Sequence, residues 1–359
     1  MYCVQVGCVF VGVTAVTLSL SGDLNVLTDH TDPSPDTRVT VSGHPKPISA
    51  IAVDQTGQTY FVCSLSALAG GDNLVLRWND SIGCEGKVRG TRHTSAVCGA
   101  VCTQTGRLLT VGLDDTLRMA SLGNNSYEAD AVVKFKAQPR GVGCDSVSKL
   151  VAVATNESLV LVHIGTCLTI AAEVAVDGEP FCVGVRPDGR EVAVGCKDGK
   201  FLLIPICATR LTSCCFYSGK VRLFAVGSDS CSLTPGAVLE RHRGEVTGCK
   251  YSPDGSRLAT CDGNREVLVW DPAAGTVAVD KMVFHRARVT CVGWSADGVR
   301  LATGSLDGQI IIWDTSKPPL EGHVRVDRAH VGGVTALEWV GVDKIVSGGF
   351  DSCVKSWAV

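Results

Sequence analysis

HRARVTCVGWSADGVRLATGSLDGQIIIWD, residues 285–314, is the stretch that decides the fold of this 359-residue chain. Variants of the same unit occupy residues 242–271 and 330–357, and each unit starts with a histidine. The opening histidines are 43 and 45 residues apart. Within each unit, Val/Leu/Ile-rich runs separated by short polar turns predict antiparallel strands. A repeat of this length is typical of a four-stranded sheet that is copied around a ring.

Weaker copies of this unit extend toward the N-terminus and begin near residues 44, 93, 131 and 174. With seven units in all, we predict an all-β fold, a seven-bladed β-propeller, over residues 38–359. The last unit ends at Val359 with its third strand, and RVTVSG (38–43) is a strand without a unit. We expect this N-terminal strand to complete the last blade and close the ring, which would remove two exposed sheet edges.

Residues 1–29 are surplus to the ring. They contain three short apolar runs, which predict an orphan β-meander. The first 22 residues carry no charge, so a secretory signal is the alternative. No basic segment precedes the apolar run and polar residues interrupt it, which favours strands. No other apolar run approaches the roughly 20 residues of a membrane span.

Residues 207–236 break the rhythm of the repeat. The unit before them (174–206) has Asp198 at the turn position and Ile204 where a tryptophan is expected. Between this unit and His242 the repeat predicts one strand and a short loop. The chain has about 25 residues more than these would need. A long connection in a compact fold is either functional or poorly ordered, and retained non-coding sequence is a further explanation. We favour an irregular, exposed insertion.

Charge and cysteine content narrow the function. The formal net charge is -3 and charged residues make up 19%, which argues against disorder and against a nucleic-acid-binding protein. The 18 cysteines include no CxxC pair, and most lie in strand-like runs, where a free thiol is a small buried hydrophobe. This usage suits a reducing compartment and predicts a cytoplasmic protein. A redox or metal role is the alternative for four cysteines in or beside the insertion: Cys207, Cys214, Cys215 and Cys231.

Four marked side chains recur in the strong units. A histidine precedes the first strand, a hydroxyl lies on the second, an aspartate follows in the turn, and a tryptophan lies on the third. Strand alternation can bring the four together, where they would satisfy one another's buried polar groups. We predict structural tetrads from His285, Thr303 (or Ser305), Asp307 and Trp313, from His330, Ser347, Asp351 and Trp357, and from His44, Asp72 and Trp78. The third unit has Ala120 at the tryptophan position.

A His, a Ser and an Asp together also invite a catalytic triad. The set recurs in several units, whereas a nucleophile occurs once, and the indole donor explains the arrangement without chemistry. The sequence contains no phosphate-binding loop, paired carboxylates, metal-ligand box or nucleophile elbow. We therefore expect no catalytic residues, cofactor or metal. An enzyme that uses the central funnel is the least favoured hypothesis.

Basic residues recur in the loops that enter the first strand of each unit. In a propeller these loops share one face, so the charges could form a rim for an acidic partner. A solvated face with scattered charge is the alternative. The rim candidates are Lys46, Arg92, Arg241, Arg243, Arg286, Arg288 and Arg328.

The three C-terminal units place the chain among WD-repeat proteins, and further segments resemble one family within that class. These segments resemble the C-terminal half of actin-interacting protein 1, the WD-repeat partner of cofilin, over nearly the whole chain except 207–236. They are LSLSGDLNVL (18–27), VSGHPKPISAIAVDQTG (41–57), GLDDTLRMASL (112–122), EVAVGCKDGKFLLIPI (191–206) and DSCVKSWAV (351–359).

The resemblance implies a non-enzymatic protein that promotes disassembly of cofilin-decorated actin filaments, in the cytoplasm at the actin cytoskeleton. Family members have two tandem propellers, so residues 1–29 look like the last blade of a first propeller that this chain lacks. Actin filaments and cofilin are the implied partners, and we expect a monomer that binds no nucleic acid or membrane. A WD-repeat scaffold for another complex is the alternative.

Overall fold

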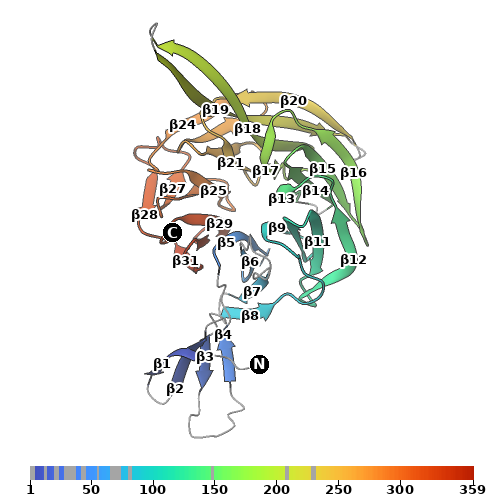
Figure 1. The fold of residues 1–359 in the computed structure, drawn as a ribbon, viewed down its shortest axis with the longest axis vertical. Helices are drawn as coiled ribbons and strands as arrows, with labels where there is room; N and C mark the ends of the chain where they lie inside the picture. The colour runs from blue at the N-terminus through green and yellow to red at the C-terminus, as the bar shows by residue number, and fades with distance from the viewer. Residues whose placement is uncertain are drawn as a thin grey trace.

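The computed structural model describes residues 5–11, 14–19, 24–27, 38–41, 46–54, 56–64, 74–79, 83–146, 149–206, 210–227 and 232–359. Of residues 5–41, 83 and 198–218 it describes the backbone alone. Every regular element in these ranges is a β-strand. Seven antiparallel sheets stand around a common axis, as predicted from the repeat (Figure 1).

The seven sheets follow one another in chain order and are called blades 1–7. Blade 1 contains β5 (Ile48–Val53), β6 (Thr59–Ser64), β7 (Val75–Asn79) and β8 (Gly83–Lys87). Blade 2 contains β9 (Val97–Cys102), β10 (Arg107–Gly112), β11 (Thr116–Ser121) and β12 (Ser126–Lys134), and blade 3 contains β13 (Pro139–Cys144), β14 (Leu150–Thr155), β15 (Ser158–Ile164) and β16 (Leu168–Ala175). Blade 4 contains β17 (Glu179–Val185), β18 (Glu191–Ile206), β19 (Arg210–Val226) and β20 (Leu233–Glu240).

Blade 5 contains β21 (Val246–Tyr251), β22 (Leu258–Asp262), β23 (Val267–Asp271) and β24 (Thr276–Met282). Blade 6 contains β25 (Val289–Trp294), β26 (Arg300–Ser305), β27 (Ile310–Asp314) and β28 (His323–Val326). Blade 7 has three strands, β29 (Val334–Val340), β30 (Lys344–Gly349) and β31 (Val354–Ala358). In each blade the first strand lies nearest the axis and the fourth, where present, lies outermost (Figure 1).

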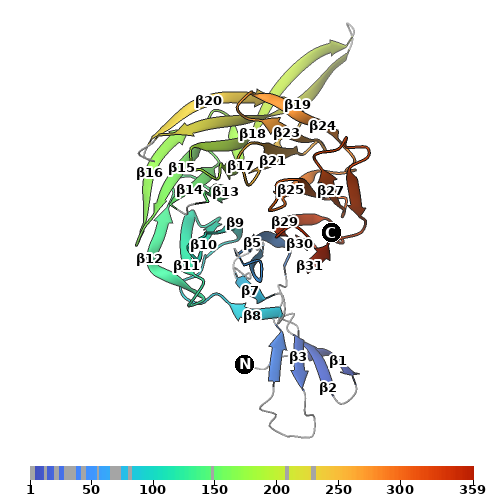
Figure 2. The same ribbon diagram turned by 180° about the vertical axis from the view of Figure 1, so that it is seen from behind.

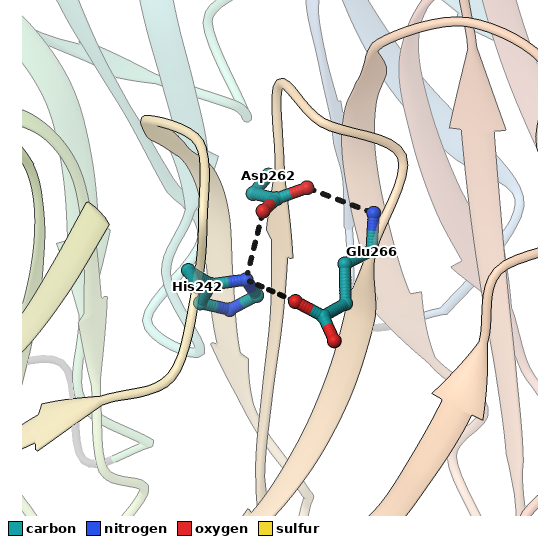
Figure 3. A group of neighbouring side chains, drawn as sticks. All are labelled: His242, Asp262 and Glu266. Atoms are coloured by element: carbon teal, nitrogen blue, oxygen red, sulfur yellow. Dashed lines mark hydrogen bonds and ion pairs between the residues drawn. The ribbon is translucent and has the colours of Figure 1, made fainter. Parts of the chain in front are cut away.

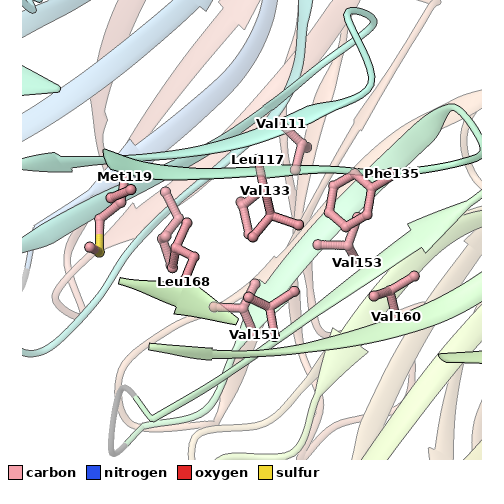
Figure 4. Packing of buried hydrophobic residues seen from close by; sticks show 12 residues of the cluster. Val111, Leu117, Met119, Val133, Phe135, Val151, Val153, Val160 and Leu168 are labelled. Carbon is pink, nitrogen blue, oxygen red and sulfur yellow. The ribbon is translucent and has the colours of Figure 1, made fainter. Parts of the chain in front are cut away.

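Neighbouring blades pack face to face, which explains why the middle strands are apolar on both faces. Every residue of β6 and of β14 is buried, whereas in the outer strand β16 only Leu168 is buried. Between blades 2 and 3, Leu117, Met119 and Val133 pack against Val151 and Val160 (Figure 4). Burial of this kind contributes about 25 cal/mol per Å² of apolar surface and holds the ring together.

Hydroxyl groups on the first strands join one blade to the next. Ser49 Oγ donates to the Val97 carbonyl at 2.6 Å, Thr247 Oγ1 to Val289 at 2.7 Å, and Thr290 Oγ1 to Val334 at 2.6 Å. Each bond satisfies a carbonyl on the strand of the following blade, where water has little access. The repeat therefore encodes contacts between blades as well as within them.

The ring closes differently from the sequence prediction. The expected closing strand, β4 (Arg38–Val41), pairs with β3 (Leu24–Leu27), in a sheet with β1 (Gln5–Val11) and β2 (Thr14–Ser19). This sheet lies outside the ring, so the predicted three-strand meander is a four-stranded one and blade 7 keeps three strands (Figure 1). Blade 7 instead meets blade 1 through side-chain packing, in a core cluster of Ala336 and Val346 with Ile48, Ile51, Tyr60 and Val62. Pairing between consecutive strands closes a shorter loop than pairing with the far end of the chain, which favours it entropically.

The insertion is also placed differently. The strands β18 and β19 pair without interruption from Glu191↔Ala225 to Ile206↔Arg210, so they form a long hairpin that extends beyond the ring (Figure 2). The third strand of blade 4 is therefore 220–226, and the prediction that Ile204 holds the tryptophan position was wrong. By register, Phe224 holds it: Phe224 pairs with Val192, as Trp270 pairs with Leu258 in blade 5.

Ten of the twelve described cysteines are buried or half-buried, in agreement with their interpretation as small apolar side chains. All twelve are free, and burial raises the pKa of several thiols, that of Cys291 to about 12. Such thiols stay protonated and behave as small apolar side chains. Among the described residues, no helix has the length and apolarity needed to cross a membrane.

Candidate functional site

The structure brings together the predicted four side chains of blade 6. His285 Nδ1 lies 3.1 Å from Asp307 Oδ2, and His285 Nε2 lies 2.9 Å from Thr303 Oγ1. Trp313 Nε1 donates to the same hydroxyl at 2.9 Å. Because the Asp307 carboxylate can only accept, the ring proton is assigned to Nδ1, and the Thr303 hydroxyl donates to Nε2. Because that hydroxyl is bonded on both sides, it is held in place and is not presented to a substrate.

Blade 7 repeats this arrangement. His330 Nδ1 lies 2.8 Å from Asp351 Oδ1, and its Nε2 lies 2.8 Å from Ser347 Oγ. Trp357 Nε1 donates to Ser347 Oγ at 2.8 Å.

In blade 6 the turn that carries Asp307 needs a glycine at the next position. Gly308 has a φ of +78°, and a Cβ there would lie 2.6 Å from the His330 carbonyl oxygen.

Blade 2 keeps the histidine and replaces the indole. His93 bonds to Asp114 at 2.8 Å and to Thr110 at 2.9 Å. Ala120 stands at the tryptophan position, and the opposite residue in the register, Tyr127, places its hydroxyl 3.0 Å from Thr110 Oγ1. The sequence analysis missed Tyr127; an aromatic residue on the strand that follows an alanine at this position is the signal that could have identified it.

Blade 1 contains only part of its predicted set within the described residues, because His44 and Asp72 lie outside them. Trp78 pairs with Tyr60 in the register, as Trp313 pairs with Leu301 in blade 6. Val62, two residues after Tyr60, occupies the position that Thr303 occupies in blade 6, two residues after Leu301. Among the described residues the Trp78 Nε1 group has no hydrogen-bond partner, so the hydroxyl link of the tetrad is missing here.

The His–Asp pairs make the fold sensitive to acid. Burial opposes ionisation of Asp307, but hydrogen bonds from His285 and from the backbone N–H groups of Arg286 and Gln309 outweigh it and lower its pKa to about 2. The pKa of Asp351 is lowered in the same way, by His330 and by two backbone N–H groups. A depressed native pKa stabilises the folded state above the unfolded-state pKa of about 4, and this contribution is lost as the pH falls toward 2.

We therefore expect Asp307→Asn to lower the melting temperature clearly at pH 7 and by less at each step from pH 5 to pH 2. The substitution removes a charge whose stabilising interactions protonation would remove anyway. Thermal unfolding followed by circular dichroism across this range measures the difference. Glu321→Gln changes an exposed side chain, and its melting temperature should not approach that of the unaltered chain at low pH in this way. A difference in melting temperature between Asp307→Asn and the unaltered chain that stays constant from pH 7 to pH 2 would contradict the assigned role.

The predicted basic rim divides into two kinds of residue. Five of its members are exposed and form no ion pair with any described residue: Lys46, Arg92, Arg243, Arg286 and Arg328. Arg241 lies 3.6 Å from Asp280, and Arg288 is paired with Glu245 and lies 5.5 Å over the ring of Phe181. All seven lie in loops that enter first strands, at one end of the ring axis. The basic residues without an ion pair to a described residue therefore lie on this loop face.

Apolar side chains accompany the charges on blades 6 and 7. Val331 is 78% exposed, Phe350 45% and Leu306 37%. A Cβ on Gly333 would lie 2.9 Å from Leu306, and one on Gly332 would lie 3.4 Å from Phe350, so the three belong to one patch. An exposed apolar patch beside unpaired arginines is typical of a protein-binding surface.

The axial channel opens on the same face. A cavity of about 610 Å³ is lined there by Phe181, Arg288 and Phe350, and a second of about 450 Å³ lies toward the other end. Both are lined by Lys250 and Glu338, whose side chains form an ion pair of 2.6 Å. Lys250 loses part of its hydration in the channel, which opposes its charge, but the ion pair with Glu338 outweighs this effect and raises the lysine pKa. The pair links blades 5 and 7 past blade 6.

A ring of seven such sheets, with His–Ser/Thr–Asp–Trp sets in its blades, defines a WD40-repeat β-propeller. The family model "WD domain, G-beta repeat" matches residues 233–271 and 278–314. The chain is homologous over nearly its full length to actin-interacting protein 1 and WD repeat-containing protein 1.

Three curated relatives show the extent of this similarity. The chain is 32% identical to the 66 kDa stress protein of Physarum polycephalum over 98% of its length, and 30% identical to actin-interacting protein 1-2 of Arabidopsis thaliana over 98%. It is 29% identical to WD repeat-containing protein 1 of Gallus gallus over 99%. The alignments cover 53%, 52% and 53% of these relatives, so the chain spans about half their length.

Proposed function

We propose that this chain is a non-catalytic actin-binding propeller that acts with cofilin to promote disassembly of actin filaments. The observation that carries the proposal is its similarity, over 98% and 74% of its length, to two proteins named actin-interacting protein 1-2 and actin-interacting protein 1. The tetrad hydroxyls of blades 6 and 7 are engaged by a histidine and an indole, which is a structural use rather than a catalytic one. In this proposal the chain acts in the cytoplasm, at the actin cytoskeleton, as a monomer.

The binding surface in this proposal is the loop face. Its five basic residues, which have no ion pair with a described residue, would meet an acidic surface of the partner. The apolar patch of Leu306, Val331 and Phe350 would supply the area that is desolvated. Charges at the edge of an interface set the association rate and its salt dependence. The rim is therefore expected to matter most at low ionic strength.

Reversing two rim charges, Arg243→Glu with Arg286→Glu, is expected to weaken filament binding by about tenfold, or ~1.4 kcal/mol. Filament cosedimentation with and without cofilin measures it, together with the actin left in the supernatant. The matched control is Arg190→Glu with Arg257→Glu, on exposed side chains near the turns at the opposite end of the ring. The control should bind like the unaltered chain.

Two outcomes would count against the proposal. If the purified chain neither cosediments nor changes the supernatant actin, the actin assignment fails for this chain. If both double variants bind like the unaltered chain, the loop face is not the binding surface. Affinity purification that recovers a stable assembly without actin or cofilin would favour a WD-repeat scaffold instead.

A further inference from the structure

Blade 5 departs from the tetrad pattern in the position of its acidic residues. In blade 6 the aspartate follows the threonine by four positions, as Asp307 follows Thr303. In blade 5, Asp262 follows Thr260 by two positions, and a second carboxylate, Glu266, stands at the end of the same turn. The histidine of this blade, His242, therefore faces two carboxylates.

The three side chains converge in a buried site (Figure 3). His242 Nδ1 lies 3.3 Å from Asp262 Oδ2 and 4.0 Å from Glu266 Oε2. His242 is 3% exposed and Asp262 is 0% exposed, yet the buried Nδ1 atom has no hydrogen-bond partner among the described residues. In blades 2, 6 and 7 the equivalent nitrogen is hydrogen-bonded to its aspartate at 2.8–3.1 Å. A buried polar atom without a partner is costly and calls for a ligand.

The backbone holds one carboxylate in place and leaves the other free to adjust. Asp262 Oδ1 accepts from the N–H groups of Asn264 at 2.9 Å and Glu266 at 2.8 Å, and Oδ2 accepts from Gly244 at 3.2 Å. The Glu266 carboxylate makes no hydrogen bond to a described residue, and its side chain is 20% exposed. It can therefore move toward a bound ion.

We propose that His242, Asp262 and Glu266 form a binding site for a divalent transition-metal cation such as Zn²⁺. One imidazole nitrogen and two carboxylates suit this ion, with bonds of about 2.0–2.2 Å and a water molecule as the fourth ligand. Bonds of that length place ligand atoms roughly 3.3 Å apart in a tetrahedron. The Nδ1–Oδ2 separation already has this value, and a small rotation of Glu266 brings in the third ligand.

The hydrogen bonds around the histidine can accommodate the ion. Metal binding at Nδ1 requires the ring proton on Nε2, which lies 2.7 Å from Thr260 Oγ1 and would donate to it. Thr260 Oγ1 also accepts from Trp270 Nε1 at 2.7 Å, so its own proton needs another acceptor. In blade 6 the equivalent Thr303 hydroxyl lies 3.3 Å from the carbonyl oxygen of Ile311, its partner in the register. The partner of Thr260 is Leu268, which offers the same carbonyl.

The experiment is a titration of the chelator-treated chain with Co²⁺, followed by competition with Zn²⁺. We expect one equivalent of Co²⁺ to give the visible absorption of a four-coordinate site with nitrogen and oxygen ligands. The ultraviolet band that cysteine thiolate ligands produce should be absent. Glu266→Gln should weaken this binding by at least about tenfold while leaving the metal-free melting temperature unchanged. Zn²⁺ should raise the melting temperature of the unaltered chain and not that of the variant.

Glu321→Gln is the matched control, because it removes an exposed carboxylate from blade 6 and should change nothing. Binding that is equally tight in Glu266→Gln, or bound Co²⁺ whose spectrum is entirely that of thiolate ligands, would overturn the proposal. Absence of Co²⁺ binding would overturn it as well. In each of these cases Asp262 would serve only to hold the turn of blade 5 through its bonds to backbone N–H groups.

Discussion

Trp313→Ala is expected to lower the free energy of unfolding by about 3–5 kcal/mol. Trp313 is 1% exposed and is among the largest fully buried side chains of the ring. It packs with Leu301 and Ile311 and stacks on Phe284 with ring centroids 5.6 Å apart. Truncation leaves a cavity between blades 5 and 6 and removes the indole donor to Thr303. Urea denaturation of the unaltered chain and the variant measures the loss.

Trp357→Ala provides an internal comparison. Trp357 makes the same hydrogen bond, but blade 7 lacks a fourth strand, whereas β28 covers Trp313 through its pairing with His323. The side chain is accordingly only half-buried, and we expect about half the loss of Trp313→Ala. Trp313→Phe should cost roughly 1–3 kcal/mol, since it keeps most of the volume and loses the donor. Equal losses in both alanine variants would contradict the view that strand coverage decides the cost.

The number of blades and two complete tetrads could be predicted because they depend on local patterns. Strand alternation and Asp-Gly turns repeat with the unit, and the pairing of Leu301 with Trp313 follows from the turn length between two adjacent strands. Tyr127 could not be predicted from the repeat alone, since its role arises from the pairing of β11 with β12 opposite Ala120. In the sequence, Glu266 of blade 5 is indistinguishable from an ordinary turn residue. Only the structure shows that its carboxylate lies beside His242.

Ring closure was mispredicted for a different reason. In the sequence, β4 is a strand that belongs to no repeat unit, and the last unit lacks its fourth strand. Assigning β4 to blade 7 assumes that every sheet edge must be paired. In the structure, β4 pairs with its neighbour in sequence, and packing of Ile48 against Val346 joins the ends of the ring. The free energy of closure thus comes from apolar packing between blades, which no strand count can reveal.

The insertion in blade 4 shows how register corrects a boundary drawn from motifs. In blades 5, 6 and 7, five residues separate the last paired residues of the second and third strands, as between Gly304 and Ile310. In blade 4 the equivalent pair is Gly195↔Val221. Removing 201–220 leaves residues 196–200 between them, which is again five. The extra segment is therefore 201–220, and the sequence boundaries of 207–236 were wrong because they included the strand β19.

Deleting 201–220 is therefore expected to leave a folded seven-bladed ring, with a melting temperature within about 3 °C of the unaltered chain. The new junction joins Lys200 to Val221, so the strand is entered by Gly-Lys as it is now by Gly219 and Lys220. Asp198 and Gly199 then take the turn positions of Asp307 and Gly308 in blade 6. Circular dichroism, size-exclusion chromatography and thermal unfolding measure the outcome.

Deleting 207–236 instead should prevent folding, because it removes the third strand of blade 4 together with Val221 and Phe224, which are 0% and 3% exposed. The core clusters that join blade 4 to blades 3 and 5 would lose these side chains, and a ring with an open gap exposes both neighbouring sheets. We expect insoluble protein or a chain without a cooperative transition. If the larger deletion folds and the smaller does not, then 201–206 is the third strand after all, and the hairpin register from Gly195 to Val221 is not that of the folded protein.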